Sequence, residues 1–310
     1  MVWPFGKNCI FGSVTKTTNM QRTTSTFSLL LLFFFLGVGI APQYFAALQA
    51  QTTGPANGSL VIVGGGGAGE EILQKFIDLA GGPEAPLLVI PTAGGGDEYD
   101  QDAGVADRLR DLGAENVLVV HTYDPEEADT KEFAQPIADA MGVWFGGGRQ
   151  WRLVDAYGGT RTEAAFHGVL ERGGVIGGSS AGATIQGSYL ARGDTRNNQI
   201  MMGDHEAGFG FIRNIAIDQH VLARNRHFDL FNILDKRPEL LGVGIDEKTA
   251  MIVQGNVFEV MGPSYVLVYD RSFWSREGSN LKELPNTNRL FYFLRDGDRY
   301  DMLQRRKINE

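Results

Sequence analysis

The sequence predicts an α/β protein built on a mostly parallel sheet with helices on both faces. Short apolar runs alternate with stretches of helical pattern from residue 60 to about residue 189. These strand-like runs are apolar throughout, which is typical of strands buried on both faces. Glycine is frequent, at 41 residues, and gathers in short runs beside apolar segments, where tight strand-to-helix turns need it.

The first half of the chain carries this alternation. Five apolar runs are expected to be strands: Leu60–Val63, Leu87–Ile90, Val117–Val120, Val143–Phe145 and Val175–Ile176. Between them, apolar residues recur at helical spacing, as Ile72, Phe76 and Ala80 do. The expected helices are Glu70–Ala80, Tyr99–Leu112, Glu132–Ala140, Gln150–Tyr157, Thr162–Arg172 and one that starts in Ala181–Tyr189.

The later part of the chain changes character. Ile215–His220 and Leu240–Ile245 are expected strands that each end in polar residues. Short strands follow at Ala250–Gln254, Val257–Met261 and Tyr265–Tyr269, joined by Gly-Asn and Gly-Pro turns, which predicts C-terminal β-hairpins. Because no internal repeat or interdomain linker is visible, residues 51–310 are expected to form a single α/β domain.

The first fifty residues differ from the rest. Residues 28–40 are nearly all Leu, Phe, Gly and Val, a run too short for a membrane span of about 20 residues. Basic residues precede it, no acidic residue occurs before Glu70, and small residues follow it up to Ala50. This pattern predicts a signal peptide over residues 1–50, with Met20 as an alternative start. The protein is then expected to be secreted or periplasmic, with no stable membrane span after cleavage; an uncleaved anchor is the alternative.

Charge and cysteine content exclude several classes of function. The formal net charge is -9 and no Lys/Arg-rich run occurs, so we expect no nucleic-acid partner. The only cysteine, Cys9, lies in the expected signal peptide, so the mature chain would have no disulfide, thiolate metal site or cysteine nucleophile. No histidine pair has the helical spacing of metal ligands, and we expect no metal site.

Ser180 is the candidate nucleophile. Gly178-Ser179-Ser180-Ala181-Gly182 fits the pattern G-x-S-x-G between an expected strand and an expected helix. A nucleophile on such a sharp turn needs small neighbours because the backbone is crowded there. The N–H groups that begin the helix, starting with that of Ala181, would face a developing oxyanion.

A serine nucleophile needs a base and a carboxylate. The five histidines are His121, His167, His205, His220 and His227. His220 is favoured because it ends a strand, where α/β sheets present their chemistry. Asp246 and Glu247 both follow a strand, and spacing alone does not choose between them. The chain order Ser, His, acid differs from the Ser, acid, His order of α/β-hydrolases, which argues against a lipase-type enzyme.

Two glycine runs follow strands and could bind a ligand through the backbone. Gly146-Gly147-Gly148-Arg149-Gln150 is a candidate for the second half of an oxyanion hole, with the N–H of Gly147 or Gly148 as donor. The run Gly64–Gly69 satisfies the dinucleotide pattern G-x-G-x-x-G. However, the next strand ends in Ile90-Pro91-Thr92 without the acidic residue that such a site needs, so we do not favour nucleotide binding.

These blocks together resemble the cyanophycinase and peptidase E family of serine peptidases (family S51), over about residues 60–270. The matching blocks are Pro91-Thr92-Ala93, Phe145–Gln150, Gly178–Ala183, Asp218-Gln219-His220 with Arg224 and Arg226, and Gly244–Ala250. The resemblance implies a flavodoxin-like fold similar to class I glutamine amidotransferases, with no cofactor. It also implies a triad of Ser180, His220 and Glu247.

The resemblance also implies a small peptide or an aspartyl polymer as substrate, with the aspartyl group in α- or β-linkage. A guanidinium suits a substrate carboxylate, so Arg224 and Arg226 are candidate ligands, with Gln150, Asp218 and Gln219 as polar contacts. Asp229 stands where cyanophycinases usually have a further arginine, and Arg149 where the family more often has Asp or Asn, which weakens cyanophycin itself as substrate. The alternatives to a peptidase are an esterase and an inactive binding protein. The protein could also form a homodimer.

Overall fold

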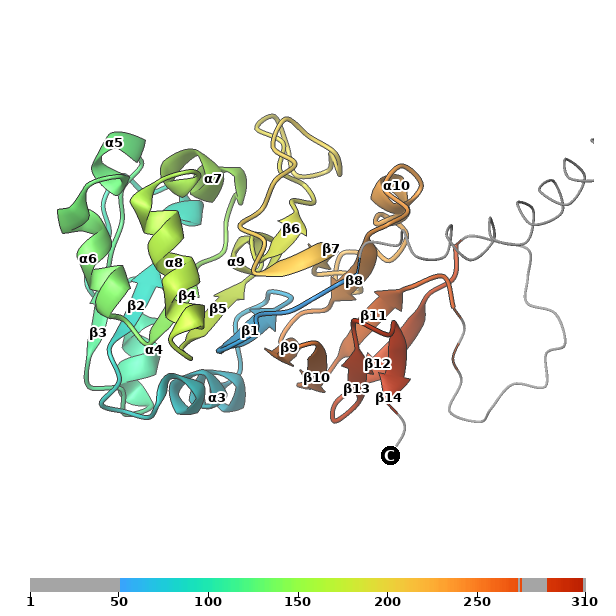
Figure 1. Ribbon diagram of the computed structural model, residues 1–310, viewed down its shortest axis with the longest axis horizontal. Helices are drawn as coiled ribbons and strands as arrows, with labels where there is room; N and C mark the ends of the chain where they lie inside the picture. Colours follow the sequence, from blue (N-terminus) through green and yellow to red (C-terminus); the bar gives the residue numbers. More distant parts are fainter. Residues whose placement is uncertain (1–50, 273, 275–288, 309–310) are drawn as a thin grey trace, which may run out of the picture. The chain divides into compact units, whose positions relative to one another are not determined.

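The computed structural model describes residues 51–272, 274 and 289–308 (Figure 1). The expected signal peptide over residues 1–50 lies outside the described residues. The described chain forms two sheets: a nine-stranded sheet in the order β14-β13-β10-β9-β1-β5-β4-β2-β3, and a five-stranded sheet in the order β12-β11-β8-β7-β6. Within these ranges, no helix is both long enough and apolar enough to cross a membrane.

The large sheet contains β1 (Ser59–Val63), β2 (Leu87–Ile90), β3 (Val117–Val119), β4 (Gly142–Phe145), β5 (Val175–Ser179), β9 (Ala250–Gln254), β10 (Val257–Met261), β13 (Arg299–Asp301) and β14 (Arg306–Ile308). The small sheet contains β6 (Gly187–Tyr189), β7 (Ile212–Gln219), β8 (Leu241–Ile245), β11 (Tyr265–Tyr269) and β12 (Tyr292–Arg295). The helices are α3 (Glu70–Ala80), α4 (Ala106–Asp111), α5 (Pro125–Ala128), α6 (Lys131–Asp139), α7 (Trp151–Tyr157), α8 (Arg161–Glu171), α9 (Ala181–Thr184) and α10 (Phe231–Leu234), with a 3-10 turn, η2, at Thr92–Gly94.

Five neighbouring strands of the large sheet form its parallel core, as predicted. Strands β1, β5, β4, β2 and β3 pair in parallel, and β9 adds to β1 in antiparallel direction. Because parallel strands point the same way, the carboxyl ends of β1, β5, β4 and β2 meet at one edge of the sheet. That edge collects the Gly64 turn, Ser180 and the Gly146–Gly148 turn.

Alternation along each strand gives the large sheet two buried faces. Val61 and Val63 of β1 face one core together with Leu73 and Phe76 of α3. Leu60 and Ile62 face the other core, which also contains residues of α6, α7, α8 and the small sheet. Burial on both sides explains why these strands read as continuous apolar runs.

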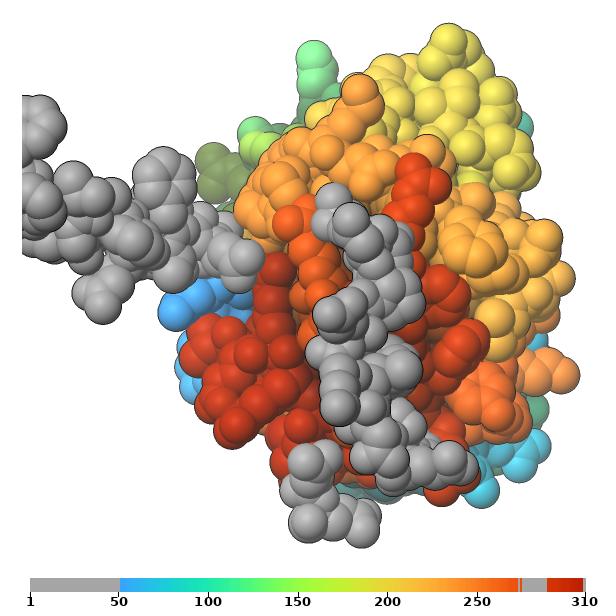
Figure 2. Space-filling view, turned by 90° about the vertical axis from the view of Figure 1, so that its right-hand side faces the viewer, coloured from blue at the N-terminus to red at the C-terminus, as the bar shows by residue number. Residues whose placement is uncertain are grey.

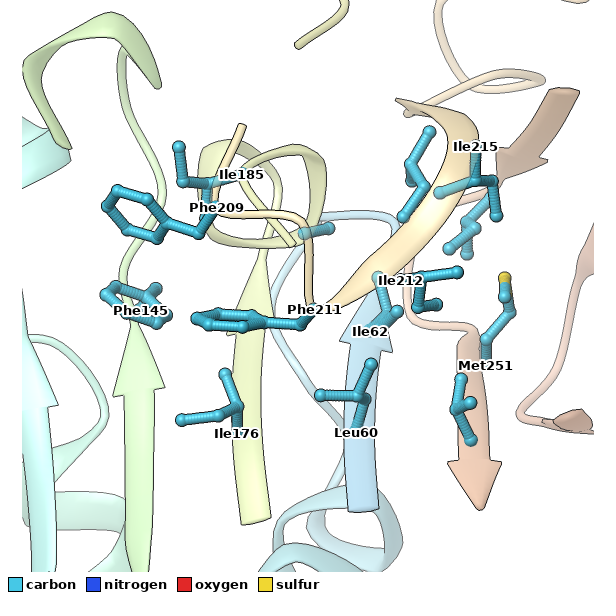
Figure 3. Packing of buried hydrophobic residues seen from close by; sticks show 14 of the residues in the cluster. Leu60, Ile62, Phe145, Ile176, Ile185, Phe209, Phe211, Ile212, Ile215 and Met251 are labelled. Carbon is cyan, nitrogen blue, oxygen red and sulfur yellow. The ribbon is translucent and has the colours of Figure 1, made fainter. Parts of the chain in front are cut away.

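The small sheet packs against the second of these faces (Figure 3). Phe211, just before β7, and Ile212 and Ile215 of β7 share one buried cluster with Leu60 and Ile62 of β1, and the Phe211 ring lies above Ile176 of β5. This packing brings the far end of β7 to the edge of the large sheet that carries Ser180. The backbone N–H of His220 there donates a 2.8 Å hydrogen bond to the carbonyl oxygen of Gly64.

A helix starts at Ala181 as predicted, but it ends at Thr184 and β6 follows, because this segment is buried nearly all round and its apolar pattern suits a strand as well as a helix. Two other local predictions were wrong. The helix expected over 99–112 is restricted to α4, since Gly104 adopts a φ of 69° that a helix cannot continue through. The Gly255-Asn256 turn joins a hairpin as predicted, but Gly262-Pro263 connects β10 to β11 in the other sheet.

We expect Phe166→Ala to lower the free energy of unfolding by about 3–5 kcal/mol, because it leaves a cavity in the core. Phe166 is fully buried on α8 and its ring lies 4.9 Å from that of Phe145 and 5.8 Å from that of Phe209. Urea denaturation measures the change. Leu118→Ala is the control, since Leu118 is 42% exposed. A loss below about 1 kcal/mol for Phe166→Ala would contradict this packing.

Candidate active site

Ser180 sits on a sharp turn between β5 and α9. Its backbone has φ 58° and ψ -110°, in the left-handed half of the map that costs a residue with a β-carbon some strain. Its N–H donates to the carbonyl oxygen of Val63 at 3.0 Å, which ties the turn to the end of β1. The turn leaves Ser180 half-buried at the end of β5.

The small residues of the G-x-S-x-G block are required by direct contacts. A β-carbon at Gly178 would collide with the carbonyl oxygen of Gly182, and one at Gly182 would collide with that of Phe145. The two glycines therefore allow β4, β5 and α9 to approach each other closely enough to form the turn.

His220 joins Ser180 to a carboxylate. Its Nε2 lies 2.9 Å from Ser180 Oγ, and its Nδ1 lies 2.6 Å from Glu247 Oε1. Because a carboxylate only accepts hydrogen bonds, the Nδ1 atom carries the proton and Nε2 can accept the serine hydroxyl proton. His220 is 4% exposed and has a φ of 55°, so it too is held in a strained backbone conformation.

The geometry separates the two acidic neighbours at the end of β8. Glu247 contacts His220, whereas Asp246 accepts hydrogen bonds from the N–H groups of Leu222 and Ala223 and from the Ser264 hydroxyl. Burial opposes ionisation of Asp246, but these hydrogen bonds outweigh it and lower its pKa. Asp246 thus anchors the loop that follows His220.

The Gly64–Gly67 turn after β1 completes this arrangement, a role that the sequence alone did not indicate. Gly65 has a φ of 116° and lies against the His220 imidazole, and Gly66 has a φ of 67° and lies against the Glu247 carboxylate. A side chain at either position would occupy the space of the catalytic candidates. The local signal was the glycine run itself, which fits a dinucleotide pattern that the sequence analysis did not favour.

The turn after β4 lies beside Ser180. A β-carbon at Gly147 would be 3.4 Å from Ser180 Cβ and 3.9 Å from Oγ. Among the described residues, none accepts a hydrogen bond from the backbone N–H of Gly147, Gly148 or Ala181. These N–H groups therefore remain available to an oxygen atom placed at Ser180, as an oxyanion hole requires.

The Pro91-Thr92-Ala93 block contacts the turn after β4. The Ala93 carbonyl oxygen accepts the Arg149 N–H at 2.8 Å, and Gly148, with a φ of 141°, fits only because it lacks a side chain next to that carbonyl. The Thr92 hydroxyl in turn is hydrogen-bonded to Tyr157 at 2.6 Å and to His121 at 2.8 Å.

The five residues predicted to bind substrate fall into two groups. Arg224 is exposed, and Arg226 is 4% exposed with its Nη1 hydrogen-bonded to Gln219. Gln150 and Asp218 are almost completely buried: Gln150 donates to the Ala191 carbonyl at 2.7 Å, and both carboxylate oxygens of Asp218 bind Arg192. The Asp218 carboxylate and the Gln150 amide nitrogen are thus hydrogen-bonded within the protein, and the contact of these two residues with substrate stays a prediction.

The remaining histidines have other surroundings. His121 is hydrogen-bonded to Thr92, and His205 contacts Asp155 and Asp204. His167 packs against the ring of Phe211, and His227 against that of Phe228. The choice of His220 from its strand end agrees with its contact to Ser180.

Electrostatics keep His220 neutral. Burial lowers the pKa of His220 below its ordinary value of 6.5, the hydrogen bond to Glu247 opposes this, and the positive charges of Arg224 and Arg226 add to the lowering. A neutral imidazole with a free Nε2 is the form that a general base needs at neutral pH.

The α/β fold, together with a strained serine hydrogen-bonded to a histidine that is itself hydrogen-bonded to a glutamate, is typical of a serine-type hydrolase. The chain belongs to peptidase family S51, whose family model matches residues 60–261. A cyanophycinase from Geminocystis herdmanii is 30% identical over 256 residues, which cover 78% of this chain and 93% of that protein. A cyanophycinase from Trichormus variabilis is 28% identical over 85% of this chain and 92% of that protein.

A solved structure shares the fold. The crystal structure of a peptidase from an acI-B1 Actinobacterium superposes with a TM-score of 0.56 at 24% sequence identity, over 80% of this chain and 98% of that one. The solved structure confirms the predicted α/β fold, and membership of family S51 makes the protein a serine-type peptidase.

We expect Gly65→Ala to lower kcat by about 100-fold or more, because the new methyl group would displace the His220 imidazole and the residue would be strained at its positive φ. Gly69→Ala is the matched control in the same run, since Gly69 has a φ of -65° and no atom near its added methyl group. Steady-state kinetics on a peptide substrate compare the two. Equal activities would show that the glycine turn does not position His220.

Proposed function

We propose that this protein hydrolyses aspartyl or β-aspartyl peptides through a Ser180–His220–Glu247 triad and an acyl-enzyme. The observation that carries the proposal is the chain of two hydrogen bonds, 2.9 Å from Ser180 to His220 and 2.6 Å from His220 to Glu247. Membership of peptidase family S51 and the similarity to cyanophycinases support the substrate class.

Acylation begins at Ser180. His220 Nε2 takes the hydroxyl proton while Oγ attacks the scissile carbonyl carbon. Glu247 accepts a hydrogen bond from the Nδ1–H group and stabilises the imidazolium that forms. The N–H of Ala181 and one N–H of the Gly147–Gly148 turn would stabilise the negative oxygen of the tetrahedral intermediate.

Collapse of the intermediate breaks the C–N bond. The imidazolium of His220 gives its proton to the leaving amine, which departs and leaves an ester on Ser180. Water then attacks that ester with His220 again as base, and the serine hydroxyl is restored. The proposed reaction requires no cofactor at any step.

Two arginines favour a substrate that carries a carboxylate. Arg224 and Arg226 lie close enough to His220 for their charges to lower its pKa. Arg224 is exposed and, among the described residues, its guanidinium has no ion-pair or hydrogen-bond partner. A guanidinium binds a carboxylate in bidentate fashion, so the free carboxylate of an aspartyl group would be held next to the triad.

We expect Ser180→Ala to reduce cleavage of β-aspartyl dipeptides by at least about 10⁴-fold, because the nucleophile is lost. Ser179→Ala, one residue earlier on β5, is the matched control and should keep most of the activity. Chromatography of the released amino acids measures both. Unchanged cleavage by Ser180→Ala would refute the mechanism.

Substrate preference is tested with three substrates: β-aspartyl dipeptides, the same dipeptides with the free carboxylate of the aspartyl residue converted to an amide, and p-nitrophenyl acetate. A clear preference in kcat/KM for the free carboxylate supports the proposal. Preference for the ester would instead favour an esterase. A binding protein would be favoured if none of the three substrates were hydrolysed and a fluorophosphonate did not label Ser180.

The pH profile should report His220. Because the base works only when neutral, kcat/KM should rise through the pKa of His220, which lies below 6.5, and then level off. Arg224→Met removes a positive charge that lowers this pKa, so the acid limb should move to higher pH. Measurement with p-nitrophenyl acetate avoids any effect on carboxylate binding, and Arg213→Met, at the opposite end of β7, is the control. A profile that Arg224→Met leaves in place would contradict the assignment.

A further inference from the structure

Arg192 is an unusual residue for a protein interior. It is fully buried in the segment between β6 and β7, with a φ of 60°. Its guanidinium binds both carboxylate oxygens of Asp218, at 2.7 and 2.9 Å, and the carboxylate of Asp229 at 2.6 Å. Its Nη1 donates to the carbonyl oxygen of Asn198 at 2.9 Å, so every nitrogen of the group is engaged.

The two carboxylates flank the loop that carries the base and the candidate substrate ligands. Asp218 lies two residues before His220, and Asp229 lies three residues after Arg226. One guanidinium from another segment therefore holds both ends of the loop. The surface view places residues 190–210, in yellow, against the orange segment that contains this loop (Figure 2).

Arg226 has the opposite situation. It is 4% exposed, and its Nη1 donates to the side chain and the carbonyl oxygen of Gln219. Among the described residues, no carboxylate lies within 4 Å of its guanidinium. Burial lowers its pKa, and the charge of Arg192 adds to this, while the charges of Asp218 and Asp229 act in the other direction. A nearly buried cation without its own anion is suited to receive one from a ligand.

We propose that Arg192 is a positioning residue for substrate binding: it keeps Asp218 and Asp229 paired, so that Arg226 stays free for the carboxylate of the substrate. A buried carboxylate that loses its cation is costly and recruits another. Without Arg192, the buried Asp218 would pair with Arg226 and occupy the group that the substrate needs. The inference rests on the proposed function and specifies how its carboxylate site is kept open.

The experiment compares Arg192→Met with the double variant Arg192→Met/Asp218→Asn. The single variant should raise KM for a β-aspartyl dipeptide by about tenfold or more, the effect of losing one charge-assisted hydrogen bond, with a smaller change in kcat. The double variant should recover most of the loss, since the neutral amide that replaces the Asp218 carboxylate no longer competes for Arg226. Hydrolysis of p-nitrophenyl acetate, which has no carboxylate, should fall much less than hydrolysis of the dipeptide in both variants.

Arg196→Met is the matched control. Arg196 lies in the same segment and also pairs with a fully buried aspartate, Asp194, but its side chain is 73% exposed and, in the described part of the chain, hydrogen-bonds to Asp194 alone. It should leave KM unchanged. Thermal unfolding of every variant shows whether it is folded. If Arg192→Met does not fold, Arg192→Lys replaces it. The lysine keeps the positive charge but cannot make the bidentate contact, so it should raise KM less than Arg192→Met would.

The outcomes separate this inference from the proposed function. If the wild-type protein does not prefer the dipeptide with a free carboxylate over its amide, the proposed carboxylate-binding site is wrong. If wild type prefers it and Arg192→Met leaves KM unchanged, the inference alone fails. A raised KM that Asp218→Asn does not rescue also overturns it, because loss of the loop's structure would then be the cause.

Discussion

The structure of this peptidase depends on the contact between the Gly64–Gly66 turn and the ends of β7 and β8. Gly64 receives the N–H of His220 at 2.8 Å and donates its own N–H to Thr249 at 3.0 Å, and Gly65 receives the N–H of Lys248 at 2.8 Å. These hydrogen bonds join the end of β1 in the large sheet to the ends of two strands in the small sheet. Only glycine permits so close an approach, because a side chain would displace His220 or Glu247.

The join explains how three separated residues become one site. Ser180 comes from β5 in the large sheet, whereas His220 and Glu247 come from the ends of β7 and β8 in the small sheet. Ser180, His220 and Lys248 all have φ values between 55° and 58°, so the backbone is strained at each of these strand ends. Such strain persists only where packing holds it, and here two apolar cores and the glycine turn do so.

Charge is arranged around the site so that each group keeps its required state. Burial and two nearby arginines favour neutral His220, and Glu247 fixes its tautomer. Hydrogen bonds from the backbone and Ser264 keep Asp246 ionised and occupied with the loop after His220. Arg192 pairs with both Asp218 and Asp229, so neither carboxylate forms an ion pair with Arg226, and Arg224 of the same loop is exposed.

Local periodicity and small residues at strand ends are enough to predict the parallel strands, the helices α3, α6, α7 and α8, and the Ser180 turn. The sequence also favoured His220 by its strand end. Only the folded chain shows the division into two sheets, the end of α9 at Thr184 with β6 after it, the roles of Asp246 and Asp218, and the contacts of the Gly64–Gly66 turn. Each of these depends on contacts between residues far apart in the chain, such as Arg192 with Asp218 and Gly65 with His220, which no local pattern records.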